Sequence, residues 1–339
     1  MSAQARLAAR AAPRLSVVIP VFNEEAGLPA LFARLYPALD ALQRSYECIF
    51  VDDGSVDRSV ALLREMFQRR PGQTRLVILR GNFGQHAAIL AGFERARGEF
   101  VVTLDADLQN PPEEIARLVA AHDAGHDYVG TIRQQRQDSW WRRRASAAMN
   151  AIRARISGIR MADQGCMLRG YSREIVGAIN QSREVTTFLP ALGALYALRA
   201  IEIPVRHEER HAGASKYSLY RLIRLNFDLV TGFSVVPLQI FSLFGIGVSI
   251  VSLLVYVVVM VQRLLAGEPL GMLRTFWDRD ILQFFLTGIV LFGLGLVGEY
   301  VGRIYQQVRE RPRFLVQAVL EREPESSAWQ KRSSSATTT

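Results

Sequence analysis

Two long apolar segments near the C-terminal end restrict the folds open to this 339-residue chain. Residues 236–261 read VPLQIFSLFGIGVSIVSLLVYVVVMV, and residues 281–298 read ILQFFLTGIVLFGLGLVG. A helix needs roughly 20 apolar residues to cross a hydrocarbon core about 30 Å thick. The first segment exceeds this length, and the second reaches it if Glu299 and Tyr300 lie at the interface. Two buried core helices are the alternative, but little else in the chain could enclose them. We therefore expect a two-helix transmembrane hairpin at residues 236–303, with the lipid bilayer as a partner.

The distribution of basic residues predicts how this hairpin is oriented. The chain carries 41 Lys and Arg against 32 Asp and Glu, a net charge of +9. Such a balance is common in nucleic-acid-binding proteins, but arginines here cluster beside the apolar segments, so no nucleic-acid partner is expected. Four of them follow the second segment: Arg303, Arg309, Arg311 and Arg313. Because cytoplasmic flanks carry the excess of Lys and Arg, both chain ends are expected in the cytoplasm.

The flanking segments complete the predicted domain organisation. Residues 1–12 contain arginines with no apolar stretch after them, which is typical of a disordered tail and not of a signal peptide. Residues 216–235 alternate leucines with arginines and predict an amphipathic helix at the membrane interface. Residues 304–339 are expected to form a cytoplasmic tail that is partly disordered. The two cysteines, Cys48 and Cys166, form no metal or disulfide pattern, which fits a reduced compartment.

Residues 13–215 alternate short apolar runs with amphipathic stretches and predict one catalytic domain. Predicted strands lie at residues 15–20, 47–53, 75–79, 100–107, 128–131 and 200–205. Predicted helices begin near Glu24, Asp57, Gln85 and Pro112, and another covers residues 139–156. Strands that are apolar on both faces and alternate with helices build a parallel α/β sheet. Ligands of such sheets bind beyond the carboxyl ends of the strands, so we expect the functional site there.

Acidic residues lie where three of these predicted strands end. They lie in PVFNE at residues 20–24, VDDGS at 51–55 and DADLQ at 105–109. An acidic residue at a strand end is often a helix N-cap, which is the alternative for Asp52 and Asp53. Three carboxylate groups at one sheet edge are costly unless a cation compensates, and hard oxygen ligands suit Mg²⁺ or Mn²⁺. The sequence therefore predicts a divalent metal with a diphosphate, and strand alternation places Asp105 and Asp107 on the same side.

The common phosphate-binding loops do not occur in the sequence. The first predicted strand is followed by PVFNEE and not by the GxGxxG of dinucleotide-binding folds, and there is no Walker lysine loop. Metal and arginine side chains are then left to hold the diphosphate, because guanidinium forks match phosphate oxygens.

Four motifs in this order resemble those of the GT-A, family 2 glycosyltransferases that act on polyisoprenyl phosphates. They are PVFNEE, VDDGS, DADLQNPPEE and the R-x-x-G-x-SKY pattern at residues 210–217. The resemblance covers residues 15–317 and implies a GT-A, Rossmann-like, mostly parallel sheet domain followed by an interfacial helix and two transmembrane helices. It also implies inverting transfer from a UDP-sugar, Mg²⁺ or Mn²⁺ as cofactor, and a homotetramer. In the tetramer, the ERPRFLVQAVLE segment could add an edge strand to a neighbour.

Four further segments are similar to the members that transfer 4-deoxy-4-formamido-L-arabinose from UDP to undecaprenyl phosphate. They are residues 130–142, 163–173, 187–205 and 298–317. This likeness implies a role in modifying lipid A with aminoarabinose, the pathway of polymyxin resistance. It places a multi-pass protein in the bacterial inner membrane, with its catalytic domain in the cytoplasm. The alternative is a bactoprenol glucosyltransferase, which would use UDP-glucose and the same undecaprenyl phosphate.

The resemblance assigns roles to individual residues. Nucleotide-sugar binding falls to Pro20, Phe22, Glu24, Val51, Asp53, Asp105, Ala106 and Arg133. Metal binding falls to Asp107 and Gln109, and the catalytic residues are Asp105, Asp107 and Arg210. Lipid-phosphate binding falls to Arg142, Arg210 and Lys216. Simple packing is the alternative for Phe22, a solvated basic face for Arg133 and Arg142, and headgroup attraction for Arg210 and Lys216.

Two histidines, His86 and His207, are candidates for a general base, but the reaction does not require one. A phosphate monoester has a second pKa of about 6 and is mostly dianionic at neutral pH. The lipid phosphate oxygen can then attack C1 of the sugar, while metal and arginines stabilise the leaving diphosphate. An inactive scaffold would have lost the acidic motifs, and a processive synthase would carry Q-x-x-R-W and more spans. The acidic motifs are present and the Q-x-x-R-W motif does not occur, so the sequence fits neither an inactive scaffold nor a processive synthase.

Overall fold

The structure is a computed structural model that describes residues 13–133, 161, 163, 165–182, 188–208, 235–266, 276–309 and 311–322. The chain divides into two compact units. The first, the sheet unit, takes in the chain up to Arg183, Thr187–Lys216 and the part from Pro312 onward. The second, the helical unit, takes in Glu184–Thr186 and Tyr217–Arg311. The helix predicted at residues 139–156, and all of the one predicted at 216–235 except its last residue, lie outside the described residues.

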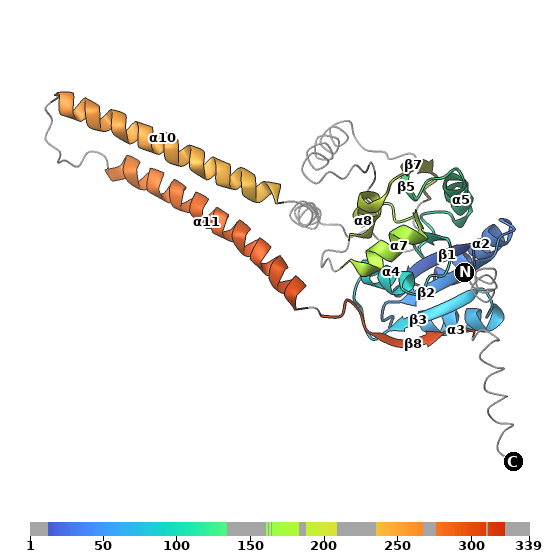
Figure 1. The fold of residues 1–339 in the computed structure, drawn as a ribbon. Coiled ribbons are helices and arrows are strands. Elements are labelled where there is room, and N and C mark those ends of the chain that lie inside the picture. Colours follow the sequence, from blue (N-terminus) through green and yellow to red (C-terminus); the bar gives the residue numbers. More distant parts are fainter. Residues whose placement is uncertain are drawn as a thin grey trace, which may run out of the picture. The chain divides into compact units, whose positions relative to one another are not determined.

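The sheet unit is built on an eight-stranded sheet with the order β7-β5-β6-β4-β1-β2-β3-β8 (Figure 1). The strands are β1 (Leu15–Val21), β2 (Tyr46–Asp52), β3 (Thr74–Leu79), β4 (Phe100–Thr103), β5 (Tyr128–Arg133), β6 (Arg169–Ser172), β7 (Ala200–Val205) and β8 (Val316–Leu320). Strand β1 pairs in parallel with β2 and β4, β2 with β3, and β5 with β7, whereas β6 and β8 run antiparallel to their neighbours. The predicted mostly parallel α/β fold is thereby confirmed.

Strand β4 is shorter than the predicted strand at residues 100–107. It ends at Thr103, after which the Leu104 N–H donates to the Val18 carbonyl at 3.0 Å. The backbone then turns, and Leu108 adopts a left-handed conformation with φ of 59°. Asp105 and Asp107 therefore lie in a loop, and the expectation that strand alternation sets their direction was wrong. Strand β6 was not predicted at all.

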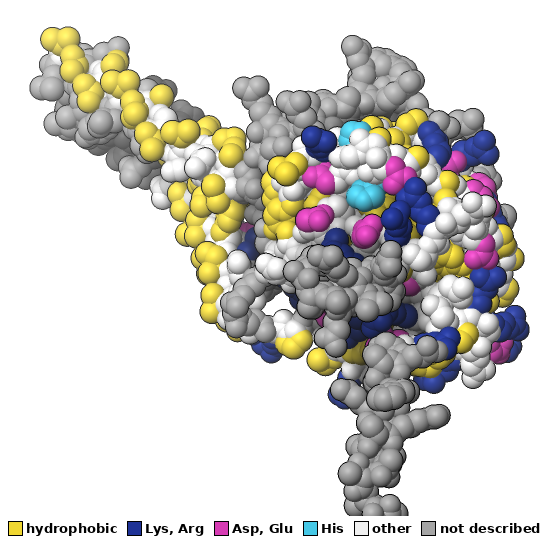
Figure 2. All heavy atoms as spheres, turned by 45° about the vertical axis from the view of Figure 1, so that its right-hand side comes forward, with side chains coloured by type: hydrophobic (Ala, Val, Ile, Leu, Met, Phe, Trp, Pro, Cys, Tyr) yellow, Lys and Arg dark blue, Asp and Glu magenta, His cyan; other side chains and the backbone are white. Residues whose placement is uncertain are grey.

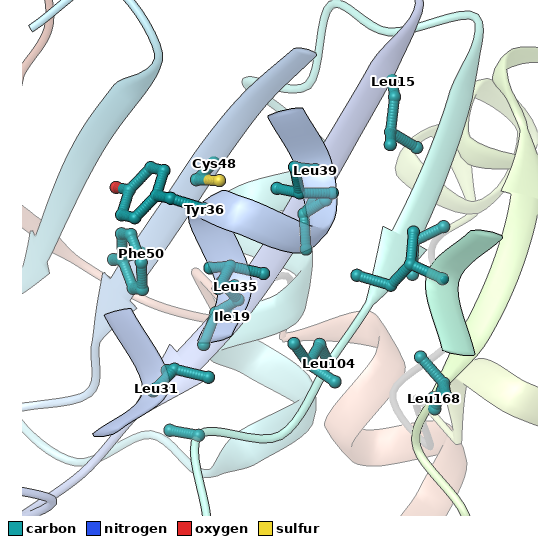
Figure 3. Close-up of a cluster of buried hydrophobic side chains, with 14 of the residues drawn as sticks. Leu15, Ile19, Leu31, Leu35, Tyr36, Leu39, Cys48, Phe50, Leu104 and Leu168 are labelled. Atoms are coloured by element: carbon teal, nitrogen blue, oxygen red, sulfur yellow. The ribbon is translucent and has the colours of Figure 1, made fainter. Parts of the chain in front are cut away.

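Helices cover both faces of the sheet. On one face lie α2 (Leu28–Asp40), α3 (Ser59–Arg69) and α5 (Ile115–Asp123), the last preceded by a 3-10 turn, η1 (Pro112–Glu114). On the other lie α4 (Gln85–Phe93), α7 (Arg173–Gln181) and α8 (Leu189–Tyr196). The leucines of α2 recur at helical spacing and are fully buried against Ile19 and Phe50 (Figure 3). Each such leucine stabilises the fold by roughly 1.5–3 kcal/mol.

Strand β8 completes the sheet from the C-terminal end of the chain. It pairs antiparallel with β3, so that Val319 lies opposite Val77. Glu321, directly after the strand, forms ion pairs with Arg97 at 3.0 Å and with Arg75 at 3.6 Å. The segment predicted to add an edge strand to a neighbour thus adds it to its own chain, because β3 offers an open edge and basic partners there.

The helical unit contains two long helices, α10 (Val236–Ala266) and α11 (Phe276–Val308). At 1.5 Å per residue they are about 46 and 50 Å long, and the exposed side chains described on them are largely hydrophobic (Figure 2). Among the described residues, Leu286–Val308 is long and apolar enough to cross a membrane, whereas the apolar stretch of α10, Leu238–Val248, is shorter. One predicted span thus has a counterpart by length and composition, and the other stays a prediction.

Candidate active site

The loops that follow β1 and β2 are locked together by hydrogen bonds between side chains and backbone. The Asn23 N–H donates to Ser55 Oγ at 3.0 Å, and Asn23 Oδ1 accepts from the Val56 N–H at 2.9 Å. The Glu24 N–H donates to Ser59 Oγ at 2.9 Å. Asn23 has φ of 54°, a conformation that asparagine tolerates better than most residues. This interlocking fixes the loop that carries the exposed ring of Phe22.

The buried carboxylate of Asp53 organises the loop before α4. It accepts hydrogen bonds from the Phe83 N–H at 2.7 Å and the Gly84 N–H at 2.9 Å. Burial raises the pKa of Asp53 above its ordinary value, although these two N–H groups oppose the change. Gly54 has φ of 75°, and a Cβ there would lie 2.5 Å from the backbone of Gly81, so only glycine fits.

The helix N-cap alternative for Asp52 and Asp53 is not what the structure shows. Helix α3 begins at Ser59, with Arg58 at its cap position. Asp52 is buried, and its Oδ2 accepts from the Ser55 N–H at 3.2 Å. Its Oδ1 has no hydrogen-bond partner among the described residues, and burial raises the pKa of Asp52.

Asp105 is the most perturbed carboxyl group at this edge of the sheet. Its Oδ1 accepts from Gln85 Nε2 at 2.5 Å, and Gln85 is the first residue of α4. Burial, and then the charge of Asp107, raise the pKa of Asp105 to about 7, while Arg133 acts in the opposite direction. The short segment of residues 83–85, which leads into α4, therefore contacts both Asp53 and Asp105.

The donor set at Asp105 and Asp107 fits a divalent cation. The repulsion that raises the pKa of Asp105 is the cost that a bound cation would relieve. Asp107 Oδ1 accepts from the Gln109 N–H at 3.1 Å, which keeps the carboxylate and the glutamine on one turn. Among the described residues, no group of three or more His, Cys, Asp or Glu could hold a metal alone. A cation would therefore need further oxygens from a diphosphate and water, as Mg²⁺ commonly does.

Arg133 is fixed by a two-pronged ion pair at the end of β5. Its Nε donates to Asp163 Oδ2 at 2.7 Å and its Nη2 to Asp163 Oδ1 at 2.9 Å. Burial acts to raise the pKa of Asp163, but the bonds and charge of Arg133 outweigh it and lower that pKa. A Cβ on Gly165 would lie 2.7 Å from Arg133 Nη2. Arg133 is therefore oriented, and its charge acts on Asp105.

The fully buried Arg169 holds the loop that presents Asp163. Its Nε donates to the Cys166 carbonyl at 2.8 Å, its Nη1 to the Tyr128 hydroxyl at 2.6 Å, and its Nη2 to the Asp163 carbonyl. A buried guanidinium is tolerated only when its donors are satisfied. Arg169 thus positions Asp163, which in turn positions Arg133.

The two histidines occupy different surroundings. Burial lowers the pKa of His86 to about 4, and its ring packs edge-on against Phe188 with centroids 5.4 Å apart. Its Nδ1 has no hydrogen-bond partner among the described residues. Burial also lowers the pKa of His207, on which the charges of Arg133, Asp107 and Asp163 also act. His207 therefore lies at the acidic edge, and His86 lies beside it on α4.

The structure brings together most of the predicted site residues. Pro20, Phe22, Glu24, Val51, Asp53, Asp105, Ala106, Asp107, Gln109 and Arg133 all lie at or just beyond the carboxyl ends of β1, β2, β4 and β5. Arg142, Arg210 and Lys216 lie outside the described residues. The sequence did not predict Gln85, Asp163 and Arg169. Two signals were available: Asp163 and Arg169 lie in the segment 163–173 that the resemblance singled out, and Gln85 stands at the start of a predicted helix after the turn RGNFG.

The sequence of the chain is similar to those of known proteins. Residues 16–179 match the model of the family described as glycosyl transferase family 2. The undecaprenyl-phosphate 4-deoxy-4-formamido-L-arabinose transferase of Edwardsiella ictaluri (strain 93-146) is 48% identical over 306 residues, which cover 90% of this chain and 94% of that relative. A match of this length necessarily includes most of residues 217–311.

The solved structures that the chain resembles are more distant. Glucosyl-3-phosphoglycerate synthase from Mycobacterium tuberculosis, in complex with Mn²⁺, UDP and glucosyl-3-phosphoglycerate, is 19% identical with a TM-score of 0.44. That likeness covers 66% of this chain and 80% of the other. Another structure of the same synthase is 19% identical with a TM-score of 0.43, covering 68% and 83%.

Proposed function

Because this chain belongs to glycosyl transferase family 2, we propose that it transfers 4-deoxy-4-formamido-L-arabinose from a UDP donor to undecaprenyl phosphate. The observation that carries the proposal is the identity to the Edwardsiella ictaluri transferase, which extends over nearly the whole length of both chains. The product would serve the modification of lipid A with aminoarabinose, and with it polymyxin resistance.

The carboxyl edge of the sheet supplies the donor site. The exposed Phe22 ring, with Pro20, Glu24 and Val51, would receive the nucleoside. Asp53 would bind it beside the loop that this carboxylate organises. Asp107 and Gln109, with Asp105 and Ala106 beside them, would hold Mg²⁺ or Mn²⁺, which supplies positive charge to the diphosphate. Arg133 is already oriented by Asp163 at 2.7 Å and would neutralise charge on the leaving diphosphate.

The acceptor requires little chemistry from the protein. The lipid phosphate is mostly dianionic at neutral pH, so its oxygen can attack C1 of the sugar without a base. The bond from C1 to the diphosphate breaks as the new bond forms, and a single displacement inverts the anomeric carbon. Arg142, Arg210 and Lys216 would bind the lipid phosphate. Neither His86 nor His207 is needed to remove a proton.

The setting of the reaction belongs to the same proposal. The apolar helix Leu286–Val308 supports attachment to a bilayer, where the acceptor lipid resides. We place the protein in the bacterial inner membrane as a multi-pass homotetramer with a cytoplasmic catalytic domain. The proposed boundaries are 1–12 for the tail, 13–215 for the catalytic domain, 216–235 for the interfacial helix, 236–303 for the hairpin and 304–339 for the C-terminal tail.

The decisive experiment incubates the full-length protein in lipid nanodiscs with undecaprenyl phosphate and one of two donors. UDP-4-deoxy-4-formamido-L-arabinose should yield a lipid-linked sugar by mass spectrometry, and UDP-glucose should yield little. EDTA should stop the reaction, and added Mg²⁺ or Mn²⁺ should restore it. Efficient transfer from UDP-glucose with none from the formamido donor would replace this proposal with a bactoprenol glucosyltransferase.

A further inference from the structure

Arg34, on α2, holds two carboxylates that come from distant segments of the chain. Its Nε and Nη2 donate to Glu113 Oε1 and Oε2 at 3.0 and 2.9 Å. Its Nη1 and Nη2 donate to Glu208 Oε2 and Oε1 at 2.8 and 3.0 Å. Each carboxylate thus receives two hydrogen bonds from the guanidinium fork, an arrangement that fixes geometry as well as distance.

The two carboxylates belong to segments at the active-site edge. Glu113 lies in η1, directly after the DADLQNPP loop that carries the acidic pair. Glu208 is the third residue after β7, and its N–H donates to the Gln109 carbonyl at 2.9 Å. Arg34 therefore fastens the segment after β7 to the loop that would hold the metal and the donor.

We propose that Arg34 is a positioning residue that sets where the acceptor-binding segment leaves the sheet. The inference rests on the proposed function, in which Arg210 and Lys216 bind the lipid phosphate. Glu208 stands two residues before Arg210, and two residues of extended chain reach at most about 7 Å. An anchored Glu208 therefore fixes, beside the Gln109 carbonyl, the point from which the chain continues toward Arg210. Arg34 donates to Glu113 and Glu208 and would act through these two carboxylates.

The segment that follows α2 provides a matched control. Arg44, just after α2, donates to Asp123 Oδ1 and Oδ2 at 2.9 and 2.5 Å. The exposed fractions of the side chains in this pair, 33% and 42%, are close to the 30% and 39% of Arg34 and Glu208. Both arginines join the α2 region to the α5 region, but Asp123 ends α5, on the side away from the acidic loops. Arg44 thus forms the same kind of ion pair as Arg34 but lies away from the active-site edge.

The test compares full-length Arg34→Gln, Arg34→Lys and Arg44→Gln with the unchanged protein in nanodiscs. Hydrogen–deuterium exchange should accelerate roughly five- to tenfold in peptides that contain the Glu208 amide of Arg34→Gln, because two partly exposed ion pairs are lost. The KM for undecaprenyl phosphate should rise by a similar factor, while the Kd for UDP stays within twofold. Arg34→Lys should restore part of both effects, and Arg44→Gln should show neither.

Two results would overturn the inference. Unchanged exchange at Glu208 in Arg34→Gln would show that Arg34 does not anchor the segment, whichever reaction the enzyme catalyses. Faster exchange with an unaltered KM for the lipid would show that anchoring Glu208 has no effect on acceptor binding. A wild-type protein without transfer to undecaprenyl phosphate would instead refute the proposed function, and the exchange measurement would still decide whether Arg34 fixes Glu208.

Discussion

At the amino edge of the sheet, where the parallel strands begin, both carboxylate oxygens of the buried Glu47 have hydrogen-bond or ion-pair partners. It accepts from Ser16 Oγ at 2.6 Å and from the Arg97 N–H at 2.7 Å, and it lies 3.1 Å from Arg75 Nε. At the carboxyl edge, burial and then the neighbouring carboxylate of Asp107 raise the pKa of Asp105 to about 7, and Gln85 supplies it with a neutral amide only. A carboxylate surrounded by cationic and N–H donors stabilises the fold, whereas crowded carboxylates destabilise it until a ligand arrives.

The largest effect that separates the two edges should come from Asp105→Asn or Asp107→Ala. Either change removes a group that holds the proposed metal, so turnover should fall by about 10³-fold or more. The same change relieves repulsion, so the Tm of the metal-free protein should stay the same or rise. Transfer assays and thermal melts in EDTA measure the two quantities. Full turnover of either variant would show that the acidic edge is not needed for catalysis. A large drop in Tm would show that it stabilises the fold instead.

The opposite pattern is expected for Glu47→Ala at the amino edge. This variant leaves Arg75 without its nearest carboxylate partner and takes acceptors from Ser16 and the Arg97 N–H. The free energy of unfolding should fall by about 3 kcal/mol, while turnover per folded molecule stays the same. Glu47→Gln is the control, because its amide oxygen can still accept and the loss should be smaller. If Glu47→Ala lowered turnover but not stability, the contrast between the edges would fail.

Gln85→Ala, at the carboxyl edge, should lower turnover by an intermediate amount. The variant frees the Asp105 carboxylate to rotate but removes no charged group, so turnover should fall roughly tenfold with the Kd for UDP within twofold. Gln68→Ala on α3 is the matched control, since it deletes the same side chain away from the acidic loops. A loss of turnover equal to that of Asp105→Asn would indicate that Gln85 contacts the substrate itself.

The parts of this molecule that the sequence predicted are those that depend on local patterns. Apolar runs predict strands β1, β2, β3, β5 and β7. The positions of the acidic residues at the ends of apolar runs predict that they meet at one edge of the sheet. Strand β6 reads RGYS and carries no such run. Its place depends on packing, because a Cβ on Gly170 would lie 2.1 Å from the Phe100 ring.

The missed site residues share one property, which is that their partners are distant in the chain. Gln85 contacts Asp105, Asp163 contacts Arg133, and Arg34 contacts Glu208 across 174 positions. Neither periodicity nor a short motif reports such pairs, because only the completed fold brings them together. The clustering of acidic residues at the strand ends could therefore be predicted from sequence, and their metal-binding role stays a prediction, whereas the groups that orient them could not be predicted.

The smallest effect should come from Glu321→Ala, which tests how far the amino edge depends on the C-terminal strand. Glu321 pairs with Arg97 at 3.0 Å, and the two side chains are 38% and 47% exposed. An exposed ion pair contributes about 1 kcal/mol or less, and Arg75 keeps Glu47 as its closer partner at 3.1 Å. The free energy of unfolding should therefore fall by less than about 1 kcal/mol, and the difference should shrink in high salt because salt screens exposed charges. Arg97→Ala and the double variant complete a cycle that isolates the pair. A loss as large as that of Glu47→Ala would mean that β8 holds the amino edge together, so that the well-partnered edge would itself depend on the last strand of the chain.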